Sequence, residues 1–323
     1  MSKKIAVIGA GAFGRNHVRV LKELADAPLA GLFDLDHAKA QALAAEFQTI
    51  AFGSLEEAIA AASGAVVAVP TLAHGEVGLR LLEAGLDILV EKPIAADLAT
   101  AQRLVKAAAE RERILQVGHL ERFNPAVEAL EAKLKLPLFF EIHRMSVFTP
   151  RSLDVDVVLD LMIHDLEILL ALTKQVPVEI RAAGIHVLSA KSDIANVRLE
   201  FPGGVIANLT ASRASTERVR KMRVFEPGAY HSLDYAKQEL FTIRVGEQKQ
   251  IRLEPQAIPK EEPLVRELRA FLRSMATREK PKVDGATSVE ALRVALEIVQ
   301  RIDAHADVVN KTMIEAGWDG FRA

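Results

Sequence analysis

The chain has 323 residues, half of them hydrophobic, so it is long enough to form two domains with sizeable cores. Its 41 Lys and Arg against 43 Asp and Glu give a formal net charge of -2, which argues against general binding to nucleic acid or an anionic membrane. The absence of cysteine excludes disulfides and any site built on a thiolate. There is neither a signal-peptide pattern nor an apolar run of about 20 residues, so we expect a cytoplasmic protein without a membrane span.

The first third of the chain alternates short apolar runs with Ala- and Leu-rich helical patterns, which is typical of a parallel α/β sheet. Strands that are buried on both faces read as continuously apolar. Five segments have this character: KIAVIG, LAGLFD, AVVAVP, DILVEKP and ILQVG. We therefore predict that residues 1–120 form a domain around a parallel sheet.

The pattern changes near Gly118. RFNPAVEALEAKL predicts a helix with Asn124 as its N-cap, and LFFEIHRM predicts a strand after it. The largely apolar stretch from Val157 to Leu172 predicts another helix. After Pro177 the sequence predicts strands of an antiparallel sheet with one wetter face: VEIRAAGIHV, DIANVRLEF, VIANLTASR, KMRVFE, LFTIRV and QIRL. Two amphipathic helices, at about 262–278 and 288–306, close the chain.

A glycine motif follows the first predicted strand and opens the first predicted helix. In GAGAFG, Gly9 allows the tight turn, Gly11 lets the backbone approach a pyrophosphate, and Gly14 permits close packing of helix on strand. The backbone of Ala12 and Phe13 would then present N–H groups to the phosphates. The alternative is a glycine-rich turn that only joins the strand to the helix.

An acid follows at the expected distance. Asp34 ends LAGLFD, 20 residues after Gly14, where a carboxylate can accept hydrogen bonds from the ribose hydroxyls of a dinucleotide. A carboxylate there repels a 2′-phosphate and no Arg immediately follows, so we predict NAD rather than NADP as the cofactor. Asp36 is the competing candidate, and either acid could instead cap the helix that begins near His37.

Two further strand ends carry candidate site residues. Glu91 and Lys92 end a buried strand and are candidates for cofactor contact, and the lysine charge could also orient a hydroxyl or stabilise an alkoxide. The alternative for Lys92 is an exposed, ion-paired lysine. Pro70, Thr71 and His74 follow another strand end and are candidates for cofactor contact, although His74 could equally cap a helix or lie exposed.

The apolar stretch from Val157 to Leu172 contains ionisable groups that would be costly to bury without a partner or a function. Asp160 and His164 are four residues apart, so they share one helix face. A neutral His beside an acid can take a proton from an alcohol, which favours an acid–base pair over a structural core pair or half of a metal site. We expect Asp165 to polarise or anchor the pair, and Glu167 to be solvated.

Several of these segments together resemble the Gfo/Idh/MocA family of NAD(P)-dependent sugar and inositol oxidoreductases: GAGAFGRNH, VPTLAHGEVGLRLLEAGLDILVEKP, VGHLERFNPA and DLMIHDLEIL. The family's Glu-Lys-Pro signature falls on Glu91, Lys92 and Pro93. Its Asp-x-Gly-x-His signature falls on Asp160 and His164, with Met162 in place of the glycine. The resemblance implies that Lys92, Asp160 and His164 flank the substrate carbon, with His164 as the general base. No second cluster of His and acids has the spacing of metal ligands, so we expect no metal.

The resemblance also implies the architecture: a Rossmann domain with a doubly wound parallel sheet over residues 1–120, then an α+β domain over 121–323. That second domain would contain a large, mostly antiparallel open sheet. In this family the open sheet is often used for oligomerisation, so we expect a homodimer or homotetramer.

Within the family, GHLERFNPA and ASRASTERVRKMRVFEPGAYHSLDYAKQEL most resemble the enzymes that oxidise the 3-hydroxyl of UDP-N-acetylglucosamine, a step toward the 2,3-diamino sugars of some lipid A. A nucleotide-sugar substrate needs donors for its diphosphate. The candidates for substrate binding are His119, Arg122, Asn124, Arg151 and Arg213. Two rival functions stay open: a dehydrogenase of a free sugar or inositol, and a non-catalytic dinucleotide sensor.

Overall fold

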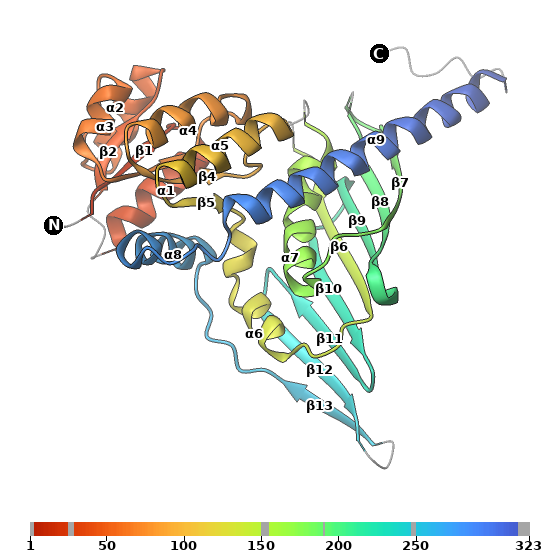
Figure 1. Cartoon of the computed structure of the whole chain (residues 1–323). Helices are drawn as coiled ribbons and strands as arrows, with labels where there is room; N and C mark the ends of the chain where they lie inside the picture. The colour runs from red at the N-terminus through yellow and green to blue at the C-terminus, as the bar shows by residue number, and fades with distance from the viewer. Residues whose placement is uncertain (1–2, 25–28, 150–154, 190, 247–249, 316–323) are drawn as a thin grey trace. The chain divides into compact units, whose positions relative to one another are not determined.

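In the computed structural model, residues 3–24, 29–149, 155–189, 191–246 and 250–315 are described (Figure 1). The chain divides into two compact units. Unit 1 comprises Met1–Phe123 and Glu261–Leu292, and unit 2 comprises Asn124–Lys260 and Arg293–Ala323. The first unit thus extends just past residue 120 and also recruits a segment from near the end of the chain, which the local sequence pattern does not indicate.

Unit 1 is built on a five-stranded parallel sheet with the order β2-β1-β3-β4-β5. The five predicted strands are all present: β1 (Ile5–Ile8), β2 (Leu29–Phe33), β3 (Gly64–Val67), β4 (Asp87–Glu91) and β5 (Leu115–Gly118). Because all five run in the same direction, their carboxyl ends meet at one edge of the sheet, where α/β proteins bind their ligands.

Helices complete unit 1: α1 (Ala12–Glu23), α2 (His37–Glu46), α3 (Leu55–Ala61), α4 (His74–Glu83), α5 (Leu98–Glu110) and α8 (Pro263–Thr277), with the short turns η1 (Thr71–Ala73) and η2 (Leu120–Phe123). α4 packs against α5, and α1 packs against α8 (Figure 1). Leu268 and Phe271 of α8 share one hydrophobic core with Val7 of β1 and Leu21 of α1. The returning helix therefore covers the same side of the sheet as α1.

Unit 2 contains an eight-stranded sheet with the order β13-β12-β11-β10-β6-β9-β8-β7, which is antiparallel except for the β6–β9 pair. Its strands are β6 (Phe139–Val147), β7 (Glu179–Ile185), β8 (Ile194–Glu200), β9 (Ile206–Ser215), β10 (Val219–Glu226), β11 (Ala229–Asp234), β12 (Glu239–Val245) and β13 (Ile251–Pro255). The predicted, mostly antiparallel sheet is confirmed, and β11 is an additional strand that the sequence pattern did not predict.

One face of this sheet is covered and the other is open. The covering elements are α6 (Pro125–Lys133), η3 (Val158–Met162), α7 (Ile163–Thr173) and the part of α9 (Gly285–Glu315) that belongs to unit 2. In β8, Val197 and Leu199 are buried in the core, whereas Asn196 and Arg198 are exposed on the opposite face. The predicted wetter face is confirmed. No helix in the described ranges combines the length and apolar character that a membrane span requires.

Candidate functional site

The predicted site residues of unit 1 gather at the carboxyl edge of its sheet. Gly9 follows β1, Asp34 follows β2, Lys92 follows β4 and His119 follows β5, each by one residue. Pro70 and Thr71 lie three and four residues beyond the end of β3. The topology therefore brings together side chains from five separate segments, as their positions at strand ends predict.

The three glycines of the motif have different surroundings. A Cβ atom on Gly9, whose φ is +112°, would lie 2.4 Å from the Ala68 carbonyl oxygen, and one on Gly14 would lie 1.9 Å from the Gly9 carbonyl oxygen. A Cβ on Gly11 would meet no protein atom within 4 Å. Gly9 thus allows the tight turn after β1, and Gly14 allows α1 to pack closely on that turn. Gly11, at the N-cap of α1, presents its backbone toward open space. This is the surface that a pyrophosphate needs.

Asp34 and Asp36 have distinct roles. The Asp34 carboxylate accepts hydrogen bonds from the backbone N–H of Ala10, at 2.6 Å, and of Asp36, at 2.8 Å. The Asp36 side chain accepts from Lys39 N at 3.1 Å and caps α2. Of the two candidates, Asp34 is therefore the carboxylate tied to the glycine turn, and Asp36 is the helix cap.

A cavity of about 390 Å³ lies beside Asp34. Phe33, Leu35, Val69 and Val77 contribute apolar walls, and Leu35 is 88% exposed. The charged side chains that line this space are Asp34, Glu56, Glu76 and Arg80, and Arg80 is ion-paired with Glu56. The size and lining suit a flat aromatic group of nucleoside size, with more negative than positive charge around it.

Lys92 follows a buried glutamate and precedes Pro93 through a cis peptide bond. His74, which is predicted to contact the cofactor, is buried in unit 1. Its Nδ1 lies 2.9 Å from the Pro93 carbonyl oxygen, and its Nε2 lies 3.0 Å from the Val69 carbonyl oxygen. Burial lowers its pKa more than these acceptors raise it, so the imidazole is neutral and its single N–H donates to one carbonyl, that of Pro93 in the Nδ1–H tautomer. Both ring nitrogens of His74 thus face the protein backbone, and its contact with the cofactor stays a prediction.

His119 and Arg122 are also buried in unit 1. Burial, followed by the positive charges of Lys92 and Arg122, lowers the pKa of His119 to about 3. The charges of Lys92 and Arg122 therefore both act on a neutral imidazole at this edge of the sheet. Such a cluster can bind an anionic or hydroxyl oxygen, although the substrate contacts of these residues stay predictions.

Asp160 and His164 lie in unit 2, where the helix has an irregularity that the sequence pattern did not predict. η3 is a π-helical turn, in which the backbone N–H of Ile163 donates to the Val158 carbonyl, five residues earlier, and α7 continues from it. Asp160 and His164 are both partly exposed. π-Turns inside helices are frequent at functional sites, because the extra residue redirects nearby side chains.

The neighbouring acids differ from each other. Asp165 is buried and forms a two-point ion pair with Arg144 of β6, with Nε–Oδ2 at 2.6 Å and Nη2–Oδ1 at 2.8 Å. It is therefore an anchor, one of the two predicted roles. Glu167 is also buried, so the prediction that it is solvated was wrong. The apolar character of its neighbours places its whole turn in the core.

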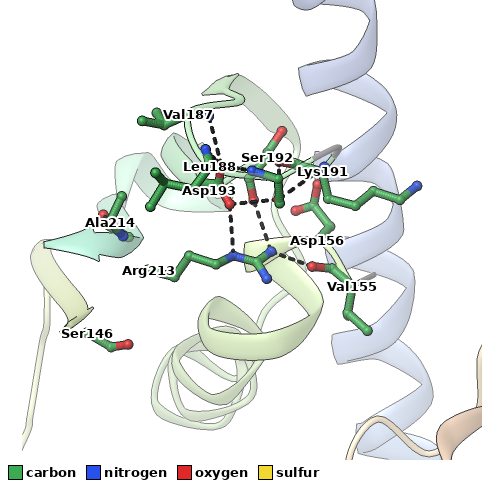
Figure 2. A network of polar contacts seen from close by, with 12 residues as sticks. Ser146, Val155, Asp156, Val187, Leu188, Lys191, Ser192, Asp193, Arg213 and Ala214 are labelled. Carbon is green, nitrogen blue, oxygen red and sulfur yellow. Dashed lines mark hydrogen bonds and ion pairs between the residues drawn. The ribbon is translucent and has the colours of Figure 1, made fainter. Parts of the chain in front are cut away.

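The candidate substrate residues of unit 2 have structural partners. Figure 2 shows the Arg213 guanidinium directed at Asp193, with Nε–Oδ1 at 3.4 Å, and at the carbonyls of Val155 and Ser192. The Asn124 side chain caps α6 through Ala126 N and donates to the Tyr235 carbonyl, both at 3.0 Å. These contacts give both residues a role in the fold, and their contact with substrate stays a prediction. Arg151 lies outside the described residues.

Two buried residues of unit 1 were missed by the sequence analysis. His17 of α1 has Nε2 2.7 Å from Glu91 Oε1, and Glu267 of α8 is fully buried. Burial, followed by the negative charge of Glu91, raises the pKa of Glu267 well above its usual range. In the sequence, the apolar faces of α1 and α8 are the signal that could have indicated the burial of His17 and Glu267. Among the residues that the structure describes, no cluster of three or more His, Asp or Glu is suited to hold a metal ion.

The glycine turn, the Asp34 contacts and the strand-edge cluster define a dinucleotide-binding protein. Residues 3–119 match the family described as "Oxidoreductase family, NAD-binding Rossmann fold", and residues 138–226 match the "GFO/IDH/MocA C-terminal domain". The chain belongs to the Gfo/Idh/MocA family, and it is an NAD(P)-dependent oxidoreductase that acts on CH–OH groups.

The chain is 34% identical over 307 residues to a UDP-N-acetylglucosamine 3-dehydrogenase of Acidithiobacillus ferrooxidans, an alignment that covers 93% of this chain and 97% of that protein. The structure of that enzyme matches with a TM-score of 0.89 over 94% of this chain and 99% of the other. An inositol 2-dehydrogenase of Renibacterium salmoninarum is 36% identical, but over 136 residues, or 41% of each chain. An Agrobacterium radiobacter oxidoreductase solved with NAD+, L-tartaric acid and magnesium shares the fold at 15% identity, with a TM-score of 0.84.

Proposed function

We propose that this enzyme uses NAD to oxidise the 3-hydroxyl of UDP-N-acetylglucosamine to the 3-keto sugar. The observation that carries the proposal is the likeness to the Acidithiobacillus ferrooxidans enzyme, which covers 93% of the chain and extends through both units, whereas alignments with inositol 2-dehydrogenases cover between 41% and 64% of it. Substrate choice depends on the second unit as well as on the cofactor domain. A match over both units therefore favours the nucleotide sugar over a free polyol.

The proposed cofactor preference depends on Asp34. Its carboxylate is oriented at the end of β2 by two backbone N–H groups, and each oxygen keeps lone-pair capacity for a ribose hydroxyl. Glu56 and Glu76 line the adjacent cavity, where Arg80 is already paired with Glu56. This negative balance disfavours the 2′-phosphate of NADP, so we propose NAD as the working cofactor. When bound, NAD would accept the hydride at its nicotinamide ring.

In the proposed reaction, Lys92, Asp160 and His164 act on the same hydroxyl group. His164 takes the hydroxyl proton, Asp160 orients the imidazole, and the Lys92 charge stabilises the oxygen as it becomes negative. A sugar hydroxyl is a far weaker acid than an imidazolium ion, which has a pKa of about 6.5. Proton removal must therefore be concerted with hydride loss or assisted by the cation.

The test is a set of parallel assays that follow NADH absorbance with purified enzyme. UDP-N-acetylglucosamine with NAD should be oxidised far faster than UDP-glucose, free N-acetylglucosamine or inositol, and NADP should be the poorer cofactor. Turnover of inositol alone would favour the rival dehydrogenase. If the protein bound NAD but oxidised none of these compounds, a non-catalytic sensor would be the better description.

We also propose the setting of this reaction. A 3-keto amino sugar is a substrate for transamination, so its product would feed 2,3-diamino sugar synthesis for lipid A in the cytoplasm. We further propose assembly into a homodimer or homotetramer through the open face of the unit 2 sheet. Between β8 and β9 this face carries the polar pairs Asn196–Thr210 at 3.0 Å and Arg198–Asn208 at 3.1 Å. Light scattering of the purified protein would measure the subunit number.

A further inference from the structure

Two buried histidines contact the residues on either side of Lys92. On the N-terminal side, His17 Nε2 lies 2.7 Å from the carboxylate of Glu91, and that carboxylate also accepts from the backbone N–H of Lys92 at 3.3 Å. On the C-terminal side, His74 Nδ1 lies 2.9 Å from the Pro93 carbonyl oxygen. Each histidine is 1% exposed. The backbone at Lys92 is therefore attached to α1 through one imidazole and to α4 through the other.

The protein leaves a fitted space for the Glu91 carboxylate. A Cβ atom on Gly118 of β5 would lie 3.0 Å from Glu91 Oε2, so the glycine makes room for that oxygen. Glu267 of α8 is fully buried, and neither of its carboxylate oxygens has a hydrogen-bond partner among the described residues. Burial and the charge of Glu91 raise the pKa of Glu267, which keeps it neutral. Of the two carboxylates, Glu91 is the one with hydrogen-bond partners among the described residues, the His17 imidazole and the backbone N–H of Lys92.

The groups around this segment converge from four directions. Among the residues that the structure describes, the charged and titratable side chains that act on it include His17 on α1, His74 on α4, His119 and Arg122 after β5, and Glu267 on α8. His119, His74 and Glu267 are held neutral by burial. The two short contacts described above act directly on the backbone next to the lysine.

We propose that His17 and His74 are positioning residues for Lys92, which hold its backbone from both sides through Glu91 and Pro93. The proposal rests on the catalytic role assigned to Lys92 under the proposed function. A displacement of about 1 Å in a catalytic group can lower turnover roughly 100-fold, so two rigid contacts next to the lysine have a direct kinetic consequence.

The two histidines use different ring nitrogens, which allows a crossed test. A glutamine amide nitrogen stands at the position of imidazole Nε2, and an asparagine amide nitrogen at the position of Nδ1. His17→Gln and His74→Asn should therefore preserve the contacts to Glu91 and Pro93, with kcat within about threefold of the wild type. His17→Asn and His74→Gln should lose them and lower kcat roughly 10- to 100-fold. The Kd of NAD, from calorimetry, should change less than about threefold in both His17 variants.

A second measurement does not depend on the substrate. Acetic anhydride labelling of the full-length enzyme with NAD, read by mass spectrometry, reports the reactivity of the Lys92 amine against that of the exposed Lys106. The contact-losing variants should change this ratio by more than about threefold, and the contact-keeping variants should not. If the wild type oxidised no nucleotide sugar, the proposed function would be wrong. The labelling ratio would still show whether His17 and His74 position Lys92.

The exposed His305→Leu serves as a control that should change neither kcat nor labelling. Equal kcat and equal labelling for the two amides at each position would overturn the proposal. So would a loss of kcat that follows the melting temperature irrespective of which amide is present. If variants at one position do not fold, the other position still carries the test. Gly118→Ala displaces Glu91 without altering either histidine and should reproduce the fall in kcat.

Discussion

Arg144 and Asp165 form a two-point ion pair in which both side chains are only 2% exposed. The pair joins β6 to the first turn of α7, directly after the π-turn that carries Asp160. The guanidinium also lies 5.1 Å from the centre of the Tyr235 ring. The helix that carries the proposed general base is thus fixed to the sheet one residue after His164.

Removing one member of this pair should strongly destabilise the fold, because the other charge stays buried without its partner. We expect Asp165→Ala to lower the free energy of unfolding by about 3–5 kcal/mol in urea denaturation. Glu141→Ala is the matched control, since Glu141 pairs with Arg223 across β6 and β10 but both side chains are more than one-third exposed. It should cost less than about 1 kcal/mol. Equal losses for the two variants would contradict the anchoring role.

Much of unit 1 could be predicted from the sequence because local signals and tertiary environment agree there. Strands buried on both faces must be apolar throughout, and each is followed by a predicted site residue at the same sheet edge. Asn124 and Pro125 also begin α6 as predicted, since an N-cap side chain and a proline in the first turn are local signals. These features need only the residues nearby in the chain.

The rest depends on contacts that single-sequence patterns do not contain. His17 and Glu91 are 74 residues apart, so no spacing rule links them. The π-turn at Val158–Met162 leaves the apolar pattern of the helix unchanged and is therefore invisible in it. β11 was missed because AYHSLD has alternating burial but only one strongly β-forming residue, Tyr230. Glu167 was wrongly predicted to be solvated because the prediction followed its charge and not the apolar residues around it.

Glu267 should give stability an unusual dependence on pH. Its raised pKa means that, above about 4.5, the native protein keeps a proton that the unfolded chain loses. Stability therefore falls as pH rises, by at most about 1.4 kcal/mol per pH unit until the native pKa is reached. Glu267→Gln removes this loss, so its stability relative to the wild type should increase from pH 5 upward. A constant difference across pH would show that Glu267 is ionised in the native state.

The control for that measurement is Glu279→Gln, at an exposed position just after the same helix. It should change the free energy of unfolding by less than about 0.5 kcal/mol at every pH. Urea titrations of both variants from pH 5 to 8 would provide the comparison.

The acid limb of the activity profile should not come from His119. Its pKa of about 3 keeps it neutral throughout the working pH range, so its protonation cannot switch the enzyme. His119→Gln should therefore leave the midpoint of the acid limb of kcat/KM unchanged, whatever it does to KM. His164→Asn should lower kcat by about 100-fold or more, because the proposed general base is lost. If His119→Gln lost the acid limb, His119 and not His164 would be the general base.

Cofactor preference should depend on Asp34 and not on Asp36. Asp34→Ala removes the carboxylate proposed to bind the ribose, and we expect KM for NAD to rise roughly 10- to 100-fold, with a smaller change for NADP. Asp36→Ala removes the cap of α2 and should cost about 1 kcal/mol of stability while leaving the ratio of the two cofactors unchanged. The opposite pattern would assign ribose recognition to Asp36.

Lys92 should be needed for the chemical step more than for binding. Lys92→Ala should lower kcat by at least about 100-fold, because the positive charge beside the reacting oxygen is lost, while the Kd of NAD changes by less than about threefold. Lys92→Arg keeps the charge but places it on a wider, planar group, so only partial activity should return. Lys106→Ala, at an exposed position of α5, should have no effect. Unchanged turnover in Lys92→Ala would remove the lysine from the mechanism, and a parallel loss of NAD affinity would make it a cofactor ligand instead.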